Sequence, residues 1–437
     1  MAVKIPRSTT PQVKNAELIA DVFLTGLLQQ CQVDESAPQW LKDIRQQSQS
    51  WLSRLAIPTR KDEDWRFIDL SSLTATKFIS HQNSPATCKS LPETSNSRLV
   101  FVNGVYRPEQ SDVSGLPQGI YVGNLTNLPA HCDVAKYFAQ QPGADTFTTL
   151  NTAGAKDIAV VWSERNITVT TPIQIIFIAE GSHEASFAQP RTLVFAETGS
   201  SISLIEEYVG TGEYFTNAVT EIFVQSNARV NHTRLQEESE TSYHIGKTAV
   251  SQESDSHYTI NEINLGAKLF RHNPELWQQG SQTETNLNGL TVATGAQTSD
   301  THSIVALTKP HGSTEQLHKC IVSDRAHTVF NGKVYVPKKA QLTDATQLNR
   351  NLMLSPQARV DTKPELQITA DNVKCAHGAT VSQLEAEEIF YLRSRGLSEA
   401  DANQLLIDAF AAEIVDRLTL KSLRSKITQT IEQKVKH

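Results

Sequence analysis

The stretch NITVTTPIQIIFIAEGSHEASFAQPRTLVFAETGSSISLIEEYVG, residues 166–210, shows the pattern that decides the fold. Short runs rich in Val, Ile, Thr, Phe and Tyr follow one another, and most alternate apolar with polar residues. That alternation is typical of strands with one buried face. The pattern continues from about residue 158 to residue 380, and no helical segment within it is long enough for a βαβ crossover. The residues therefore predict a β-sandwich, a β-barrel or a β-helix, and no tight repeat selects one of them.

Helical patterns flank this β region on both sides, which divides the chain into regions 1–157, 158–380 and 381–437. In the first region two segments carry apolar residues at helical spacing, and residues 98–157 then mix short strands with turns. The first segment contains Leu18, Ile19, Val22, Phe23 and Leu27, and the second contains Trp40, Leu41, Ile44, Trp51, Leu52 and Leu55.

The last region begins with one helical segment that leads to Gly396, a residue suited to a helix C-terminus. Ser398 and Asp401 form a capping pair for the next helix. That helix carries an apolar stripe that either packs on its own domain or docks another protein. The stripe comprises Ala402, Leu405, Leu406, Ala409, Phe410, Val415 and Leu418.

Composition excludes several classes of protein. The chain has 437 residues and a formal net charge of -7, which argues against nucleic acid as the main partner. Its five cysteines are scattered and show no CxxC spacing, which favours a reducing compartment. The N-terminus is polar, and the longest strongly apolar stretch, residues 173–179, is far shorter than the roughly 20 residues that span a bilayer. We expect a cytoplasmic protein without a membrane segment.

The common enzymatic motifs are missing from the sequence. The segment Asn331-Gly332-Lys333 lacks the upstream glycine of a phosphate-binding loop, and neither GxSxG nor HExxH occurs. Acidic residues are frequent in the β region, but none stands in a pattern that marks a general acid or base. We expect most of them on solvated faces.

Two Cys/His pairs carry the remaining chemical signal. His318 and Cys320, and likewise Cys375 and His377, are two positions apart, which places both side chains on one face of a strand. Thiolate and imidazole together suit iron or zinc. From spacing alone, chance pairing and core packing are the favoured explanations for both pairs. Gly378 and a helix start follow the second pair, so this pair would lie where one subunit could meet another.

Two longer segments resemble a known family. NRNLMLSPQARVDTKPELQITADNVKCAHGATVSQLEAEEIFYLRSRG, residues 349–396, closely resembles the signature of the SufB/SufD family, scaffold subunits of the Suf iron–sulfur cluster assembly machinery. PTRKDEDWRF, residues 58–67, resembles the N-terminal signature of the same family. The KCAHGAT and FYLRSRG segments are most similar to the SufD branch. The order of regions fits this family over essentially the whole chain.

The resemblance implies a mainly β fold, a right-handed parallel β-helix flanked by N-terminal and C-terminal helical domains. It implies pairing with SufB through the β-helices and binding of the ATPase SufC through the C-terminal helices. The nucleotide would then belong to SufC and none to this chain, and the isolated chain could form a homodimer. We expect the SufC-docking surface to include Phe390, Tyr391, Leu392 and Arg393.

The resemblance also assigns the second Cys/His pair. It implies that His377 helps to bind a transient iron–sulfur cluster shared with SufB, with Cys375 at the same interface. A neutral imidazole is the form that binds iron. His318 and Cys320 match no part of the signature and are left as a chance pair. Nothing matches a flavin-binding motif, so no residue is assigned to flavin.

Three alternatives stay open. The chain could be a purely structural scaffold, with the cluster wholly on SufB. It could be a β-helix enzyme that acts on polysaccharide, although no acidic cluster is apparent. The segment PTRKDEDWRF could begin a capped, salt-bridged helix, which we favour over a catalytic role.

Overall fold

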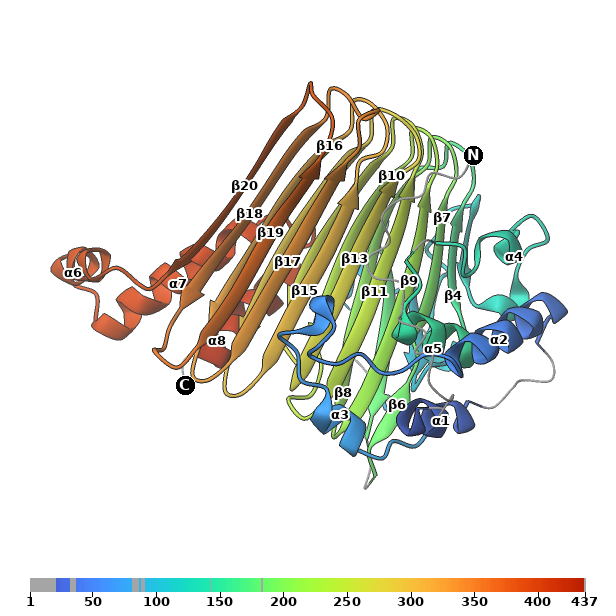
Figure 1. The fold of residues 1–437 in the computed structure, drawn as a ribbon, viewed down its shortest axis with the longest axis horizontal. Coiled ribbons are helices and arrows are strands. Elements are labelled where there is room, and N and C mark those ends of the chain that lie inside the picture. Colours follow the sequence, from blue (N-terminus) through green and yellow to red (C-terminus); the bar gives the residue numbers. More distant parts are fainter. Residues whose placement is uncertain are drawn as a thin grey trace.

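The computed structural model describes residues 21–31, 37–80, 86–87, 91–141, 143–181 and 184–435. Its centre is a parallel β-helix, in which the chain winds between two facing sheets (Figure 1). Sheet I has the strand order β2-β1-β5-β8-β10-β12-β14-β16-β18-β20. Sheet II has the order β19-β17-β15-β13-β11-β9-β7-β4-β3, with β6 beside β9. The expectation of a mainly β fold with a β-helix core and helices at both ends is confirmed.

The strands of the two sheets have the following bounds. Sheet I contains β1 (Arg98–Val102), β2 (Val105–Tyr106), β5 (Ile173–Glu180), β8 (Ser201–Thr211), β10 (Arg229–Glu237), β12 (His257–Asn264), β14 (Glu284–Ala293), β16 (Ser313–Val322), β18 (Asp344–Met353) and β20 (Lys374–Ser382). Sheet II contains β3 (Ile120–Gly123), β4 (Ala159–Ser163), β6 (Ser186–Ala188), β7 (Arg191–Ala196), β9 (Tyr214–Val224), β11 (Tyr243–Gln252), β13 (Leu269–Gln278), β15 (Thr298–Ala306), β17 (His327–Val336) and β19 (Arg359–Ile368).

From β8 onward consecutive strands alternate between the sheets, so each turn of the chain adds one strand to each sheet. The pairing is parallel and in register. Arg229 of β10 pairs with His257 of β12, and His257 pairs with Glu284 of β14, so one turn takes about 30 residues. Because neighbouring turns stay in register, side chains at equivalent positions form straight rows along the solenoid.

The turns between the two sheets repeat one backbone conformation. In each of the five successive turns from sheet II to sheet I between β9 and β18, one residue has a positive φ of about 60°. Its N–H donates to a carbonyl of the next turn, as from Asn227 to Ser254 and from Leu342 to Asn372, at 3.0 and 2.7 Å. This ladder of turns stacks one coil on the next, and its members are Asn227, Asp255, Gln282, His311 and Leu342.

The C-terminal helices α7 (Glu399–Val415) and α8 (Lys421–Val435) cover the outer face of sheet I. They follow α6 (Ala386–Ser394). Apolar side chains of α7 and α8 share one cluster with outward-facing residues of the sheet, among them Leu235, Ile263 and Leu317. Lys319 of β16 also lies 2.7 Å from Glu413 of α7. By contrast, α6 stands away from the body of the molecule beyond the last turn (Figure 1).

The predicted features of α7 are confirmed at its start and partly wrong along its length. Ser398 caps the helix by accepting from the N–H of Asp401 at 3.1 Å, and Gly396 has a φ of +97°. However, Leu405 is 46% exposed. The predicted members Ala402, Val415 and Leu418 are buried. The stripe missed Ile407, Ala411 and Ile414, which pack against the sheet with i, i+4, i+7 spacing.

The N-terminal region supplies smaller helices and a strap across sheet II. The helices are α1 (Val22–Gln29), α2 (Gln39–Leu52), α3 (Ser71–Ala75), α4 (Val134–Tyr137) and α5 (Thr146–Gly154), with short 3-10 helices η1 (Glu63–Trp65), η2 (Pro92–Thr94), η3 (Pro108–Gln110) and η4 (Leu125–Asn127). The two predicted helical segments correspond to α1 and α2, although Leu18 and Ile19 lie outside the described residues. No helix among the described residues has both the length and the apolar character needed to cross a membrane.

Candidate functional site

Cys375 and His377 lie on β20, the strand that ends sheet I. They pair in register with Ala345 and Gln347 of β18, both of which are buried inside the solenoid. Cys375 accordingly packs against the interior apolar cluster. His377 has the same parity but is exposed, because no further turn covers the last strand in the described part of the chain. The prediction that the pair shares one strand face at the exit of the β region is confirmed.

The thiol and the imidazole of this pair differ in environment. Partial burial and the nearby carboxylate of Asp344 raise the pKa of the Cys375 thiol, so it is protonated at neutral pH. A metal would have to displace that proton before the sulfur could bind. His377, by contrast, is exposed to solvent. Of the two groups, the imidazole is the more accessible ligand.

His318 and Cys320 also share one strand face, on β16, but both point into the closed part of the solenoid. Burial lowers the pKa of His318 to about 4 and raises that of Cys320 to about 12, so both are neutral. In register, His318 pairs with Asn349, which in turn pairs with Ala379 of β20. A whole strand therefore separates this pair from the terminal strand, and the structure does not bring the two Cys/His pairs together.

The described cysteines Cys31, Cys132, Cys320 and Cys375 are all free thiols, and Cys88 lies outside the described residues. Within the described residues no group of three or more His, Cys, Asp or Glu side chains is arranged to hold a metal. Iron and zinc sites with thiolate and imidazole ligands take four ligands. Cys375 and His377 together would supply two of them.

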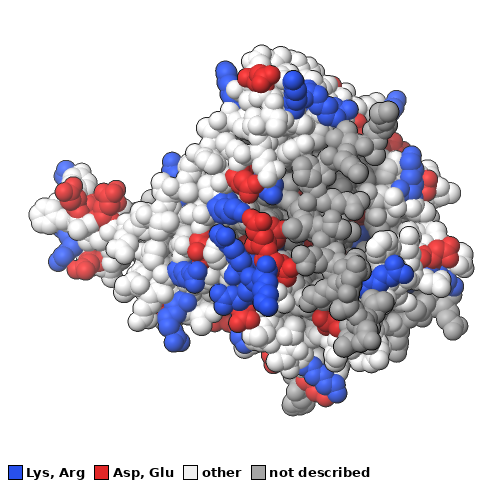
Figure 2. Space-filling view, in the orientation of Figure 1, with Lys and Arg blue, Asp and Glu red and all other residues white. Residues whose placement is uncertain are grey.

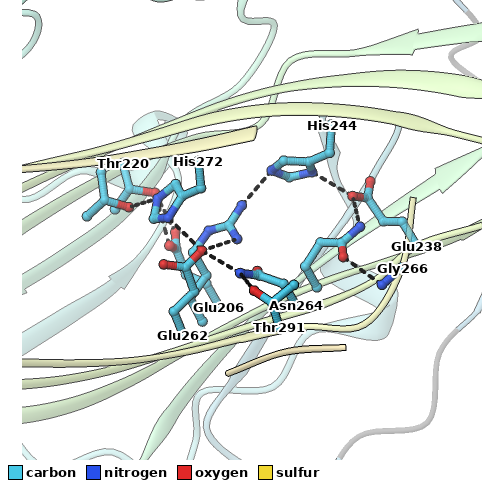
Figure 3. Close-up of polar contacts among 12 residues, drawn as sticks. Glu206, Thr220, Glu238, His244, Glu262, Asn264, Gly266, His272 and Thr291 are labelled. Atoms are coloured by element: carbon cyan, nitrogen blue, oxygen red, sulfur yellow. Dashed lines mark hydrogen bonds and ion pairs between the residues drawn. The ribbon is translucent and has the colours of Figure 1, made fainter. Parts of the chain in front are cut away.

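A row of buried ionisable residues runs along the solenoid interior, and the sequence pattern did not reveal it (Figure 3). The expectation that most acidic residues of the β region are solvated is wrong for Glu206, Glu238 and Glu262, each no more than 5% exposed. Each lies against a histidine, at 3.0 Å from His232, 2.5 Å from His244 and 2.9 Å from His272 respectively. The alternation that marks a strand with one wet face also fits a strand whose inner face is polar.

One arginine links two of these pairs, Glu262–His272 and Glu238–His244. The Arg234 guanidinium lies 3.9 Å from Glu262 and 2.5 Å from the Nε2 atom of His244 (Figure 3). Burial lowers the pKa of His272 to about 4. Burial alone would raise the pKa of Glu262, but His272 and Arg234 outweigh it and lower that pKa. Here an ionised Glu262 carboxylate lies against the neutral imidazole of His272 and the permanent cation of Arg234.

The segment 58–67 forms the strap over sheet II rather than the start of an α-helix, which corrects our interpretation. Its only helical part is η1, a single 3-10 turn. Arg271 of β13 donates to the carbonyl of Asp64 at 2.7 Å, and its guanidinium lies 4.0 Å from the Trp65 ring centroid. Lys363 of β19 lies 2.9 Å from Glu63, so the salt-bridged part of the prediction holds. Charged side chains of both signs gather on this face (Figure 2).

The predicted docking residues lie on α6. Phe390 and Tyr391 are 75% and 57% exposed, which is unusual for large apolar side chains, whereas Leu392 is half-buried. Arg393 lies 3.1 Å from Glu399 at the start of α7. The aromatic pair is thus presented to solvent on a helix that projects from the molecule.

A long parallel β-helix with helices at both ends defines the class of protein, a β-solenoid. Family models agree with this class. Residues 177–410 match the model described as "SUF system FeS cluster assembly, SufBD core domain", and residues 26–175 match the "SufBD protein N-terminal region". The chain belongs to the SufBD family and is a scaffold protein of the Suf system of iron–sulfur cluster assembly.

Similar proteins cover nearly the whole chain. The iron–sulfur cluster assembly SufBD family protein slr0076 of Synechocystis is 46% identical over 97% of each chain. Protein ABCI7 of Arabidopsis thaliana, named as chloroplastic, is 35% identical over 96% of this chain and 92% of its own. The iron–sulfur cluster assembly protein SufD of Escherichia coli is 33% identical over 89% of this chain and 92% of its own.

Proposed function

We propose that this chain is the SufD-type subunit of a cytoplasmic complex with SufB and the ATPase SufC. The β-helix pairs with SufB through the bare end formed by β19 and β20, because the last strand of each sheet leaves its backbone hydrogen-bonding groups unpaired on one edge. The same edge would allow the isolated chain to pair with a second copy. ATP hydrolysis belongs to SufC, and this chain is not itself an enzyme.

The observation that carries the proposal is the position of His377. An exposed imidazole on the inner face of the terminal strand would meet whatever covers the end of the solenoid. Together with Cys375 it offers two ligands, and SufB would supply the others for a transient cluster. Iron and sulfide are here the cargo of the complex. Family membership favours this role over a polysaccharide-active enzyme.

The test is co-expression with SufB and SufC, using the native chain or His377→Ala, followed by purification without oxygen and measurement of bound iron and sulfide. Loss of a ligand should reduce both by at least about tenfold, since even an outer-shell partner typically costs that much. The complex itself should form in equal yield. His131→Ala is the matched control, because His131 is also exposed, with 52% side-chain exposure, but lies far along the chain near Glu164.

Unchanged iron and sulfide in the His377→Ala complex would instead support the alternative of a purely structural subunit with the cluster wholly on SufB. Failure of the native chain to join SufB and SufC would contradict the proposed partners.

A further inference from the structure

A ladder of side-chain amides runs along the row of interior positions that ends at His377. In register, Gln316 of β16 pairs with Gln347 of β18, and Gln347 pairs with His377 of β20. Gln347 Nε2 donates to Gln316 Oε1 at 2.8 Å, and Gln316 Nε2 donates to Ser303 Oγ at 2.8 Å. The donors of the ladder therefore all point toward the closed part of the solenoid.

The fold makes room for this ladder. Gly332 of β17 faces it from sheet II, and a Cβ atom at that position would lie 2.2 Å from Gln347 Nε2. Only glycine leaves space for the amide there. The Gln347 side chain is thus held in one place by its neighbour on one side and by the opposite sheet on the other.

Gln347 Oε1 is buried and has no hydrogen-bond partner among the described residues. A buried acceptor without a partner costs about 1–3 kcal/mol, so such an atom calls for an explanation. The next side chain along its row is His377, one strand spacing of about 4.8 Å away. An imidazole can fill this vacancy because a neutral ring carries one N–H donor and one free lone pair.

Other amides near the terminal strand do not offer the same acceptor to His377. Asn349 Oδ1 already accepts from Asn351 Nδ2 at 2.6 Å, and Asn349 Nδ2 donates to the carbonyl of His318 at 3.0 Å. Asn351 is in register with Val381, which has no polar group. Among these amides, the unpaired oxygen of Gln347 is therefore the acceptor in register with His377.

We propose that Gln347 is a positioning residue for His377. The exposed His377 side chain does not make this contact in the structure. When it turns toward its row neighbour, Gln347 Oε1 accepts a hydrogen bond from one ring N–H, which fixes the tautomer and directs the lone pair of the other ring nitrogen toward the open end of the solenoid. Metal-binding histidines in proteins generally use their second nitrogen in this way. The role of this hydrogen bond in cluster binding rests on the proposed function. The hydrogen bond itself joins two residues of this chain and needs no partner.

The experiment measures the tautomer of His377 by ¹⁵N NMR in the full-length chain labelled with ¹⁵N-histidine, with the His377 signals assigned by their loss in His377→Ala. The spectra are recorded near pH 8, above the usual imidazole pKa of about 6.5, so that the ring is neutral. In the native chain one tautomer should dominate. Gln347→Leu should shift the tautomer ratio by about fivefold, the equivalent of one hydrogen bond of about 1 kcal/mol.

Two further variants keep this test decisive. Asn351→Leu removes an amide from the same strand and face and should leave the ratio unchanged. Gln347→Met removes the acceptor with a flexible side chain, so it replaces Gln347→Leu if that variant does not fold. A tautomer ratio that stays the same without the Gln347 oxygen would overturn the proposal, as would a native ring that accepts from Gln347 rather than donates.

The outcome separates this inference from the proposed function. If Gln347→Leu changes the tautomer ratio and the His377→Ala complex still holds normal iron and sulfide, the hydrogen bond is supported and the ligand role of His377 is refuted. If Gln347→Leu leaves the tautomer ratio unchanged and the His377→Ala complex loses its cluster, the ligand role of His377 is supported and the positioning role of Gln347 is refuted.

Discussion

At the scale of single residues, position within a turn of the solenoid decides what each side chain can do. Cys375 and His377 have the same parity as buried residues of β18, yet His377 is exposed because it lies on the last strand. His318 has equivalent parity on β16 and is enclosed. Spacing in the sequence predicted that each pair shares a face. Spacing alone could not predict which pair is open, because that depends on how many turns follow. The helix start after Gly378 was the signal that placed the second pair at the exit of the β region.

Leu342 is the one apolar member of the ladder of turns that have positive φ. Its φ is +59° and its side chain is 51% exposed, whereas the equivalent positions hold Asn, Asp, Gln and His. Leu342→Asn should raise the free energy of unfolding by about 0.5–1 kcal/mol, because asparagine tolerates this conformation better than leucine. The measurement is the shift of the urea unfolding midpoint.

Leu342→Ala is the control for this substitution. It removes the exposed apolar surface but keeps a side chain that disfavours positive φ, so its midpoint should not rise. Equal gains from alanine and asparagine would show that backbone conformation is not the cause.

At the scale of elements, α7 and α6 show two uses of an apolar helix face. The buried face of α7 covers sheet I through Ile407, Ala411 and Ile414, so most of its apolar character serves its own chain. Phe390 and Tyr391 of α6 are mostly exposed to solvent. Helical periodicity predicted both helices, but it could not say which apolar residues have a partner within the chain.

Phe390→Ala combined with Tyr391→Ala should weaken binding to SufC while leaving the fold and the pairing with SufB intact. Buried aromatic anchors typically account for about 2 kcal/mol or more of binding, so we expect at least about a thirtyfold rise in the dissociation constant. Titration calorimetry with purified SufC measures it. Trp51→Ala is the matched control, because Trp51 is 54% exposed on α2 in the N-terminal region. An equal loss in both variants would contradict docking at α6.

At the scale of the whole molecule, the interior is built from two kinds of row. Sheet II contributes an apolar row through Ile222, Val250 and Leu276, whereas sheet I contributes the ionisable row that contains Glu206, Arg234 and Glu262. Alternation in the sequence predicted the strands correctly. It did not distinguish a β-sandwich, a β-barrel and a β-helix, because strands in all three alternate apolar and polar residues. Only the family resemblance separated these folds.

The buried imidazoles make the stability of the molecule sensitive to acid. Burial lowers the pKa of His272 and His318 to about 4, so the unfolded chain takes up protons first as the pH falls. Their contribution is fully present above about pH 6.5 and is lost as the pH falls from there toward 4, by at most about 3 kcal/mol for each ring. Asp300, whose pKa burial raises to about 6, acts in the opposite direction over nearly the same range.

Urea unfolding at pH 7.5 and pH 5 measures this loss of stability. His318→Gln should reduce the difference between the two pH values, because it removes one buried titrating ring. His131→Gln replaces an exposed histidine and serves as the control. A His318→Gln chain with the same pH dependence as the native chain would refute this account.

The bare strand β20 also has a consequence for the supply of this subunit. A solenoid whose last coil has no cover exposes part of its apolar interior and a row of unpaired backbone groups, which are features that favour self-association. Chains made in excess of whatever caps this end would therefore tend to aggregate or to be degraded. If SufB caps this end as proposed, the open end ties the useful amount of this protein to the dosage of SufB.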